Sequence, residues 1–416
     1  MKIKEFCIIN NSTISQKVDC EILYLDTSSI TNNEIEGYQS FMLSKAPSRA
    51  QRKVQDKTIL YSCVRPNLRH FGILKNPPSN LVVSTGFATL DVKDECVVDP
   101  YYLYYWLSQE SITNTLHTIA QNAVSSYPSI NPSDIGDLEI DLPPINIQRK
   151  IGAFLDSLDR KISLNRSINA ELERMAKEIY DYWFVQFEFP DEHGRPYKSS
   201  GGAMVYNPVL KREVPQGWEV KKVKNVVTHI NTGLNPRDNF KLGGGDIKYI
   251  TVKNLTLEGN IDFSSCDTID EEALAKVHNR SNIQKGDILF ASISPLGRCF
   301  YIDQEPNGWD INESVFAIRP NADEISGKYL YLFLKSQEFV KKAEKSATGS
   351  IFLGIRMETL KGIDILLPAN DVIKEFDKAM NNIIGKQHQN FDENEHLTKL
   401  RDELLPLLMT GQVKIK

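Results

Sequence analysis

The stretch Thr58-Ile-Leu-Tyr-Ser-Cys-Val-Arg-Pro66 decides the fold of this chain, because the chain contains it twice. The second copy is Asp287-Ile-Leu-Phe-Ala-Ser-Ile-Ser-Pro295, and an Arg-x-Phe element follows each copy, at Arg69 and at Arg298. Each stretch is an apolar run with β-branched residues that stops at a proline, which is the pattern of a strand leading into a turn. Self-similarity at a period of about half the chain indicates a duplicated domain.

Further landmarks follow in the same order in both copies. The sequence predicts a second strand, a short aromatic-rich helix and a last strand, at residues 84–90, 102–110 and 138–142 and again at 313–319, 329–338 and 363–367. Each copy then enters a long helix. Chance does not easily align so many landmarks, so we expect one mixed α/β domain followed by one long amphipathic helix, written twice.

Composition limits the class of protein. A chain of 416 residues is too long for one ordinary core, and 41% hydrophobic with 25% charged residues is typical of a soluble globular protein. The sequence shows no apolar run of membrane-spanning length and no signal peptide, so we expect a cytoplasmic location. The net charge of −5 argues against a protein that coats DNA non-specifically, although local basic patches or basic partners remain compatible with it.

The six cysteines are scattered, without a C-x-x-C pair or a neighbouring pair of histidines, so we expect buried free thiols and no metal site.

The long helices carry a seven-residue apolar pattern typical of a coiled-coil seam. In the first helix one set of seam positions is Ile151, Leu158, Asn165, Leu172 and Ile179, and the other is Phe154, Lys161, Ile168, Met175 and Tyr182. In the second helix the seam is Ile373, Phe376, Met380, Ile383 and Gln387, resuming at Leu397, Leu400 and Leu404. We expect a local irregularity near residues 389–393.

Neither helix can bury its seam alone. An antiparallel intramolecular pair is the simplest solution, and the alternative is two separate helices that pack on their own domains or on other chains. A polar seam residue such as Asn165 would fix the register at a cost in stability.

Several segments together resemble the specificity subunit of type I restriction–modification systems, over essentially the whole chain. They are Pro143-Pro144 followed by Gln148, Ile151 and Phe154-Leu-Asp156; the linker Pro196-Tyr-Lys-Ser-Ser-Gly-Gly202; Val214-Pro-Gln-Gly-Trp218; and Leu397-Thr-Lys-Leu-Arg-Asp-Glu-Leu-Leu-Pro-Leu-Leu-Met-Thr-Gly411. The first copy departs from the pattern, because nothing at Met1 matches Gly217-Trp218-Glu219.

The resemblance implies an α+β protein with two target-recognition domains separated by two long helices that form an antiparallel coiled coil. The implied divisions are residues 1–143 (first recognition domain), 144–188 (first helix), 189–213 (linker), 214–368 (second recognition domain) and 369–416 (second helix and tail). In this family each domain reads one half of a bipartite DNA site, and the helices set the spacer and dock two methylating subunits. Restriction subunits complete the complex, and S-adenosylmethionine is bound by the methylating partner rather than by this chain.

Residues that contact DNA are sought among polar loops with clustered basic side chains, because cations and hydroxyls contact phosphates and polar groups read base edges. In the first domain the candidates are Lys45, Arg49, Arg52, Lys53, Arg65 and Arg69, and in the second Asn235, Arg237, Lys241, Lys253, Ser294, Arg298 and Arg356. The matching places of Arg69 and Arg298 suggest a shared phosphate-contacting role. Residues 121–126 and 347–350 are weaker candidates. A solvated surface charge is the competing interpretation for each.

Parts of the sequence also suggest two other functions. Asn76-Pro-Pro-Ser79 resembles the N-P-P-aromatic motif of adenine methyltransferases, but Ser79 replaces the aromatic residue and no Gly-rich cofactor loop accompanies it, so we interpret it as a turn. Similarly, Gly243-Gly-Gly-Asp246 lacks the Lys-Ser/Thr of a phosphate-binding loop. A coiled-coil assembly factor with two protein-binding heads is the second alternative.

Overall fold

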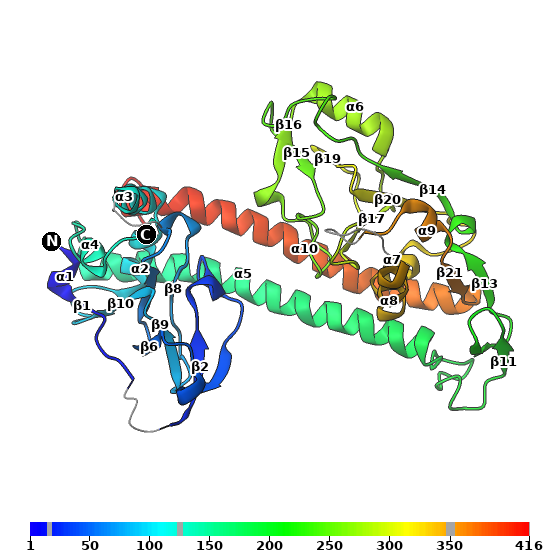
Figure 1. Cartoon of the computed structure of the whole chain (residues 1–416), viewed down its shortest axis with the longest axis horizontal. Coiled ribbons are helices and arrows are strands. Elements are labelled where there is room, and N and C mark those ends of the chain that lie inside the picture. Colours follow the sequence, from blue (N-terminus) through cyan, green and yellow to red (C-terminus); the bar gives the residue numbers. More distant parts are fainter. Residues whose placement is uncertain (15–18, 123–127, 347–353, 416) are drawn as a thin grey trace. The chain divides into compact units, whose positions relative to one another are not determined.

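The computed structural model describes residues 1–14, 19–122, 128–346 and 354–415. The chain divides into two compact units (Figure 1). Unit 1 comprises Met1–Ser163 and Asn394–Lys416, and unit 2 comprises Leu164–Glu393. Each unit therefore contains one of the duplicated domains, the beginning of the long helix that follows it and the end of the other long helix.

Both units are built on the same four-stranded sheet. In unit 1 the strand order is β1 (Cys7–Ile9), β10 (Phe87–Val92), β7 (Ile59–Ser62), β8 (Phe71–Ile73). In unit 2 it is β14 (Val227–Thr232), β20 (Val315–Pro320), β17 (Ile288–Ala291), β18 (Cys299–Tyr301). All ladders are antiparallel, and every residue of the two repeated strands β7 and β17 is buried. The shared topology confirms the duplication predicted from the sequence.

A second sheet lies beside the first in each unit, and here the copies differ. In unit 1 its order is β5 (Gln39–Met42), β2 (Glu21–Leu25), β9 (Leu81–Ser84), β6 (Ala50–Lys53), and β3 (Ile30–Thr31) pairs with β4 (Glu34–Ile35) nearby. In unit 2 it is β16 (Asp267–Ile269), β15 (Ile247–Ile250), β19 (Trp309–Ile311), with helix α6 (Glu271–Ser281) against β19. Three strands keep the same order and directions in both, β5–β2–β9 and β16–β15–β19, whereas β6 in unit 1 and α6 in unit 2 are additions of one copy.

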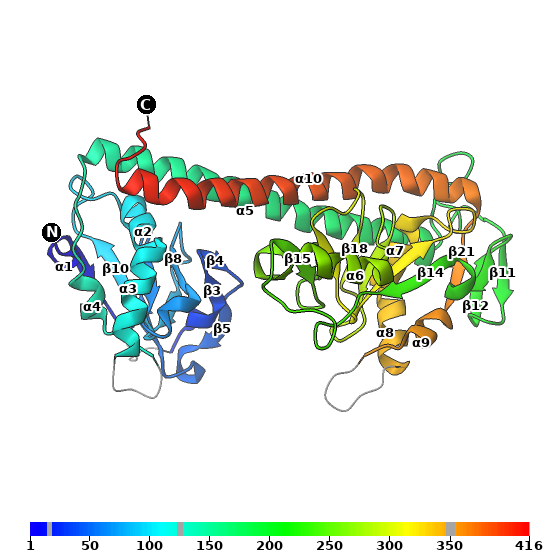
Figure 2. The same cartoon turned by 90° about the horizontal axis from the view of Figure 1, so that it is seen from above.

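Short helices complete each copy. They are α1 (Ile3–Phe6), α2 (Pro100–Ser108), α3 (Glu110–Gln121) and α4 (Pro132–Gly136) in unit 1, and α7 (Gly327–Lys335), α8 (Gln337–Ser346) and α9 (Met357–Lys361) in unit 2. Helices α2 and α7 each lie between the four-stranded sheet and the long helices (Figure 2). They begin at side-chain caps, because Asp99 accepts from the Tyr102 amide and Ser326 from the Tyr329 amide.

The structure refines several predicted elements. Residues 84–90 are not one strand, because β9 ends at Ser84 and β10 begins at Phe87. Residues 138–142 form only a bridge between Glu139 and Lys2, whereas the second copy has strand β21 (Asp364–Leu367), paired with β13 (Glu219–Lys222). The segment predicted as a linker contains the hairpin of β11 (Met204–Asn207) and β12 (Arg212–Pro215).

The long helices are α5 (Ile145–Tyr180) and α10 (Asn370–Met409), and a π-helical turn at Asp181–Val185 follows α5. Segments of the two run antiparallel within each unit. In unit 1 Asp159 pairs with Arg401 and Ile162 with Asn394, and in unit 2 Asn165 pairs with Glu393 and Asn169 with Gln387. Helix α10 is continuous through residues 389–393, so the helix itself does not break where the irregularity of the seven-residue pattern was predicted.

One set of seam positions in α5 was predicted one residue out of register. The structure buries Leu155, Ile162, Asn169 and Ala176, whereas Lys161, Met175 and Tyr182 are exposed and Phe154 and Ile168 are half-buried. Buried positions that alternate four and three residues apart repeat every seven residues, as do positions that alternate three and four apart. The heptad period therefore fits both faces of the helix. The prediction favoured the larger apolar side chains, while packing selects the face with Asn169 and Ala176.

The cysteines are all free, as predicted, but Cys20 and Cys96 are exposed rather than buried. No helix in the described residues is long and apolar enough to cross a membrane. Within the part of the chain that the structure describes, no three His, Cys, Asp or Glu side chains come together in a group that could hold a metal ion.

Candidate nucleic-acid interface

We call the shared four-stranded sheet the framework. The two copies differ most in the segment that joins the first two framework strands along the chain. The segment from β1 to β7, residues 10–58, contains β2 to β6, and the segment from β14 to β17, residues 233–287, contains β15, β16 and α6. We call these segments insert 1 and insert 2. Each is mounted on the common framework through the parallel pair β2–β9 or β15–β19. Such dissimilar segments on a common framework are where two recognition surfaces can differ without altering the core.

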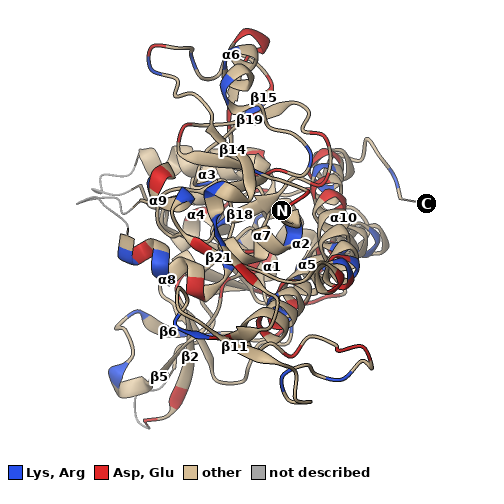
Figure 3. Cartoon of the chain, turned by 90° about the vertical axis from the view of Figure 1, so that its right-hand side faces the viewer, with Lys and Arg blue, Asp and Glu red and all other residues tan. Residues whose placement is uncertain are grey.

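Insert 1 brings four of the predicted cationic residues together. Lys45 ends the turn η2 (Leu43–Lys45), Arg49 lies just before β6, and Arg52 and Lys53 lie in β6 itself. Lys45, Arg49 and Lys53 are exposed, and no acidic residue interrupts residues 45–53. Figure 3 shows Lys and Arg positions in blue at β6. The segment is a small cationic surface suited to a phosphate backbone.

Arg52 differs from these three cations. It is half-buried, burial lowers the pKa of its guanidinium, and Nε has no hydrogen-bond partner among the described residues. A buried donor without a partner is uncommon and is costly unless something satisfies it.

Insert 2 presents a loop with both polar and cationic groups. Arg237 and Lys241 are exposed between β14 and β15, and the Asn235 backbone oxygen accepts from the Asn239 side chain, which closes the loop. Lys253 is also exposed, but its ammonium lies 3.8 Å from the Asp267 carboxylate. Amide, guanidinium and ammonium groups on one loop are the side chains that read base edges and contact phosphates.

The remaining candidates lie on the framework. Arg65 and Ser294 occupy equivalent exposed places after the repeated strands, next to the bridges Val64–Ser129 and Ile293–Gly354. Arg356 is exposed at the start of α9. The weaker candidates fall largely on residues 123–127 and 347–353, which are outside the described residues.

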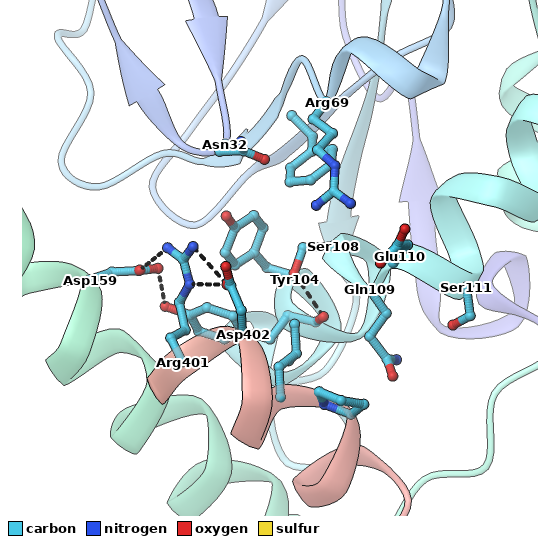
Figure 4. A pocket seen from close by; sticks show the side chains of 14 residues that line it. Asn32, Arg69, Tyr104, Ser108, Gln109, Glu110, Ser111, Asp159, Arg401 and Asp402 are labelled. Atoms are coloured by element: carbon cyan, nitrogen blue, oxygen red, sulfur yellow. Dashed lines mark hydrogen bonds and ion pairs between the residues drawn. The ribbon is translucent and has the colours of Figure 1, made fainter. Parts of the chain in front are cut away.

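Arg69 and Arg298 do not share one environment, and their shared phosphate-contacting role stays a prediction. The Arg298 guanidinium donates to the backbone oxygens of Val252, Pro295 and Ile293 at 2.6, 3.1 and 3.3 Å, so it holds this loop in place. Arg69 points toward a cavity of about 320 Å³ that α2 and the long helices of unit 1 also line (Figure 4). The repeat predicted that the two arginines occupy equivalent places in the sequence. The surrounding loops differ, so the two side chains make different contacts.

The helix pair contains polar residues that the sequence analysis missed. In unit 2 the Asn390 side chain donates to the Asn169 side-chain oxygen at 2.8 Å, and Asn169 donates to the Gln387 backbone oxygen at 3.1 Å. In unit 1 Asn394 donates to the Ile162 backbone oxygen at 3.4 Å. Asn169 and Asn394, like Ile162 and Gln387, are 225 residues apart, so one hydrogen bond occurs in both copies. This spacing was the signal that could have identified them.

A second, half-buried network occurs in unit 1. Asp159 accepts from Tyr105 at 2.6 Å and pairs with Arg401 at 2.8 Å. The positions that correspond in unit 2 carry Leu332, Ile384 and Ala176. At these three positions the contact is polar in unit 1 and apolar in unit 2, and unit 2 attaches its head through a different ion pair, Lys335 Nζ to Glu173 Oε1 at 2.6 Å.

Comparison with known proteins identifies the family. The profile of the type I restriction modification DNA specificity domain matches residues 1–174 and 215–404. The HindI specificity subunit of Haemophilus influenzae is 24% identical over 94% of this chain and 94% of its own length. The MjaIX specificity subunit of Methanocaldococcus jannaschii is 24% identical over 100% and 93%. The crystal structure of the type I restriction–modification S subunit from M. genitalium has the same fold, with a TM-score of 0.58, 17% identity and coverage of 98% and 95%. The chain belongs to the type I restriction–modification DNA specificity family.

Proposed function

We propose that this chain reads a bipartite DNA target, with insert 1 on one half-site and insert 2 on the other. The observation that supports this most is the pairing of one framework topology with two unlike inserts. A repeated framework can present two readers in the same way, while unlike inserts give each reader its own sequence. The two half-sites should therefore differ in sequence.

We further propose that α5 and α10 form one antiparallel coiled coil that sets the unread spacer between half-sites. The antiparallel hydrogen bonds found within unit 1 and within unit 2 support it. Two methylating subunits dock on these helices and restriction subunits complete the complex. This chain contributes no catalytic step, and S-adenosylmethionine binds to the methylating partner.

Methylome mapping tests the proposal. The gene is expressed with its methylating partner in a host that lacks other DNA methylation, and modified positions are read by single-molecule sequencing. We expect one split motif whose two unlike parts flank a fixed unread spacer. Replacing insert 2 with that of another family member should change only one part. A contiguous motif, or a motif changed on both sides by the exchange, would contradict the proposal.

A second measurement concerns the division of labour. In isothermal calorimetry we expect S-adenosylmethionine to give heat with the methylating partner and none with this chain alone. Binding to the isolated chain would refute the assignment of the cofactor to the partner.

A further inference from the structure

A cavity of about 260 Å³ lies in unit 2 between helix α10 and the loop that joins β18 to β19. Aromatic rings line it from several parts of the chain. They are Phe263 in the turn η6 (Phe263–Ser265), Phe300 in β18, Trp309 in β19 and Phe391 on α10. Each of the four is half-buried, so part of each side chain stays accessible. We call this cavity the cage.

The rings of the cage form one continuous wall. The centroids of Phe263 and Trp309 are 6.1 Å apart, those of Trp309 and Phe300 are 6.5 Å apart, and the Phe300 ring stacks on the His388 imidazole at 5.2 Å. His388 is 7% exposed, and its Nδ1 lies 2.6 Å from Asp303 Oδ2, which ties α10 to the β18–β19 loop. The wall is therefore in place before a ligand arrives, which lowers the cost of binding.

A difference of one residue in strand register places Phe300 at the cage. Phe71, which completes the same Arg-x-Phe pattern in unit 1, pairs with Tyr61 and is 3% exposed in the core of that unit. Phe300 pairs with Leu289 and not with Phe290, which is the residue equivalent to Tyr61. A shift of one residue moves a side chain to the other face of a sheet. The framework core therefore does not account for the aromatic ring of Phe300.

Phe391 is not a repeated feature of the long helices either. In the sequence it is the one apolar side chain between Ile384 and Leu397, within a polar stretch of α10. The position 225 residues earlier, on α5, is Arg166. The seven-residue seam therefore does not call for an aromatic residue here, and the cage residues are a property of one copy.

Carboxylates surround the rings and narrow the chemistry of the ligand. Asp303 and Glu305 come from the β18–β19 loop and Asp392 comes from α10, and among the described residues that line the cage there is no Lys or Arg. Three negative charges beside the electron-rich faces of aromatic rings attract a cation. The same charges repel the phosphates of DNA, so the ligand is not a nucleic acid.

We propose that the cage binds the guanidinium of an arginine side chain from a partner protein. A planar guanidinium stacks on aromatic rings and donates to carboxylates at the same time, which the ammonium of a lysine does less well. Glu305 and Asp392 accept its N–H groups, and the aromatic wall covers its face.

Helix α10 identifies the partner, because it supplies Phe391, His388 and Asp392 to the cage. A subunit that docks on α10 therefore presents the arginine. This step rests on the proposed function, in which methylating subunits dock on the long helices.

The test uses the full chain with fluorotryptophan at its four tryptophan positions, observed by fluorine NMR. Acetyl-argininamide is the probe, and we expect it to shift the signal of Trp309, which the variant Trp309→Phe assigns. The uncharged citrulline analogue of the probe should give no shift. Glu305→Gln combined with Asp392→Asn should weaken binding by about tenfold, because two exposed charges are removed. Glu403→Gln, an exposed residue of α10 outside the cage, is the matched control and should leave binding unchanged.

The chain assembled with its methylating partner tests the source of the arginine. We expect the Trp309 signal to shift on assembly and then to stop responding to the probe, because the partner's side chain occupies the cage. A probe that still shifts Trp309 in the complex would show that the docked subunit is not the ligand, and would overturn the proposal. No shift in the chain alone, or equal binding of the citrulline analogue, would overturn it as well. A split methylated motif would still stand in either case, so failure of the cage is distinguishable from failure of the proposed function.

Discussion

One contact between neighbouring strands is present in both copies, but the residue that carries the carboxylate is on the other side of the contact in the second copy. The Thr58 hydroxyl donates to the Asp91 carboxylate at 2.6 Å, and at the matching positions Asp287 accepts from Arg319 at 2.7 Å. Asp91 and Asp287 are buried, so each carboxylate needs its partner. The contact ties the repeated strand to its neighbour in both units, although the acidic residue sits on opposite strands.

The cysteines give a prediction for thiol reactivity. Burial raises the pKa of Cys7 and Cys299 to about 12 and that of Cys63 and Cys266 to about 11. Thiolates are the reactive form, so at pH 8 these four should react slowly in the native state. We expect two fast thiols, the exposed Cys20 and Cys96, in a titration with a chromogenic disulfide reagent. Variants Cys20→Ser and Cys96→Ser should each remove one, and six fast thiols in the native chain would contradict the burial.

The basic residues give a prediction that separates DNA contact from structure. Arg49→Ala should lower the slope of log affinity against log salt by about 0.9, the value expected for one lost phosphate contact. Arg298→Ala should leave that slope unchanged but destabilise unit 2 by about 1–3 kcal/mol, because three backbone oxygens lose their donor. Anisotropy on the mapped target at several salt concentrations, with thermal unfolding of the same proteins, measures both. If the slope of log affinity against log salt is the same for Arg49→Ala as for the unmodified chain, Arg49 does not contact a phosphate.

At the scale of elements, the long helices meet through amides as well as apolar side chains. Asn169 and Asn390 are 3% and 1% exposed and bond to each other within unit 2. A buried amide pair contributes less to stability than well-packed apolar residues, but it penalises every register in which the amides miss each other. Specifying the register matters for the proposed role of the helix pair, in which its length sets the spacer.

The amide pair can be tested by a double-mutant cycle. Asn390→Leu alone should cost about 1–3 kcal/mol, because the Asn169 side-chain oxygen loses its donor in a dry environment. Adding Asn169→Leu should recover most of that loss, since both polar partners are then replaced by apolar side chains of similar size. Urea unfolding followed by circular dichroism gives the free energies of unfolding. A double variant as unstable as the sum of the single variants would show that the two amides are not coupled.

At the scale of the whole molecule, helix length has a direct functional readout. Removing four residues, about one turn or ~6 Å, from one long helix should change the spacer by one or two base pairs. Methylome mapping of the deletion variant measures the new spacer, and a substitution of four exposed residues at the same place serves as control. Retained methylation with an unchanged spacer would mean that the helices do not set the distance.

The sequence alone determined the duplication, the order of its strands and helices, the long helices and the family. These depend on local patterns, such as the apolar run at Ile59–Ser62 and the heptad period through Ile151, Leu158 and Leu172, which are repeated and therefore reinforce each other. It also indicated the cationic stretch from Lys45 to Lys53, because clustered charge is visible without knowledge of contacts.

Only the tertiary structure decided which face of α5 is buried, what Arg298 does and where the inserts diverge. A heptad allows two neighbouring faces, and packing against α10 selected the one with Asn169 and Ala176. Arg298 holds its loop because its guanidinium reaches the carbonyl groups of Val252, Ile293 and Pro295. Contacts between residues distant in the chain fix these outcomes, and no local pattern records them.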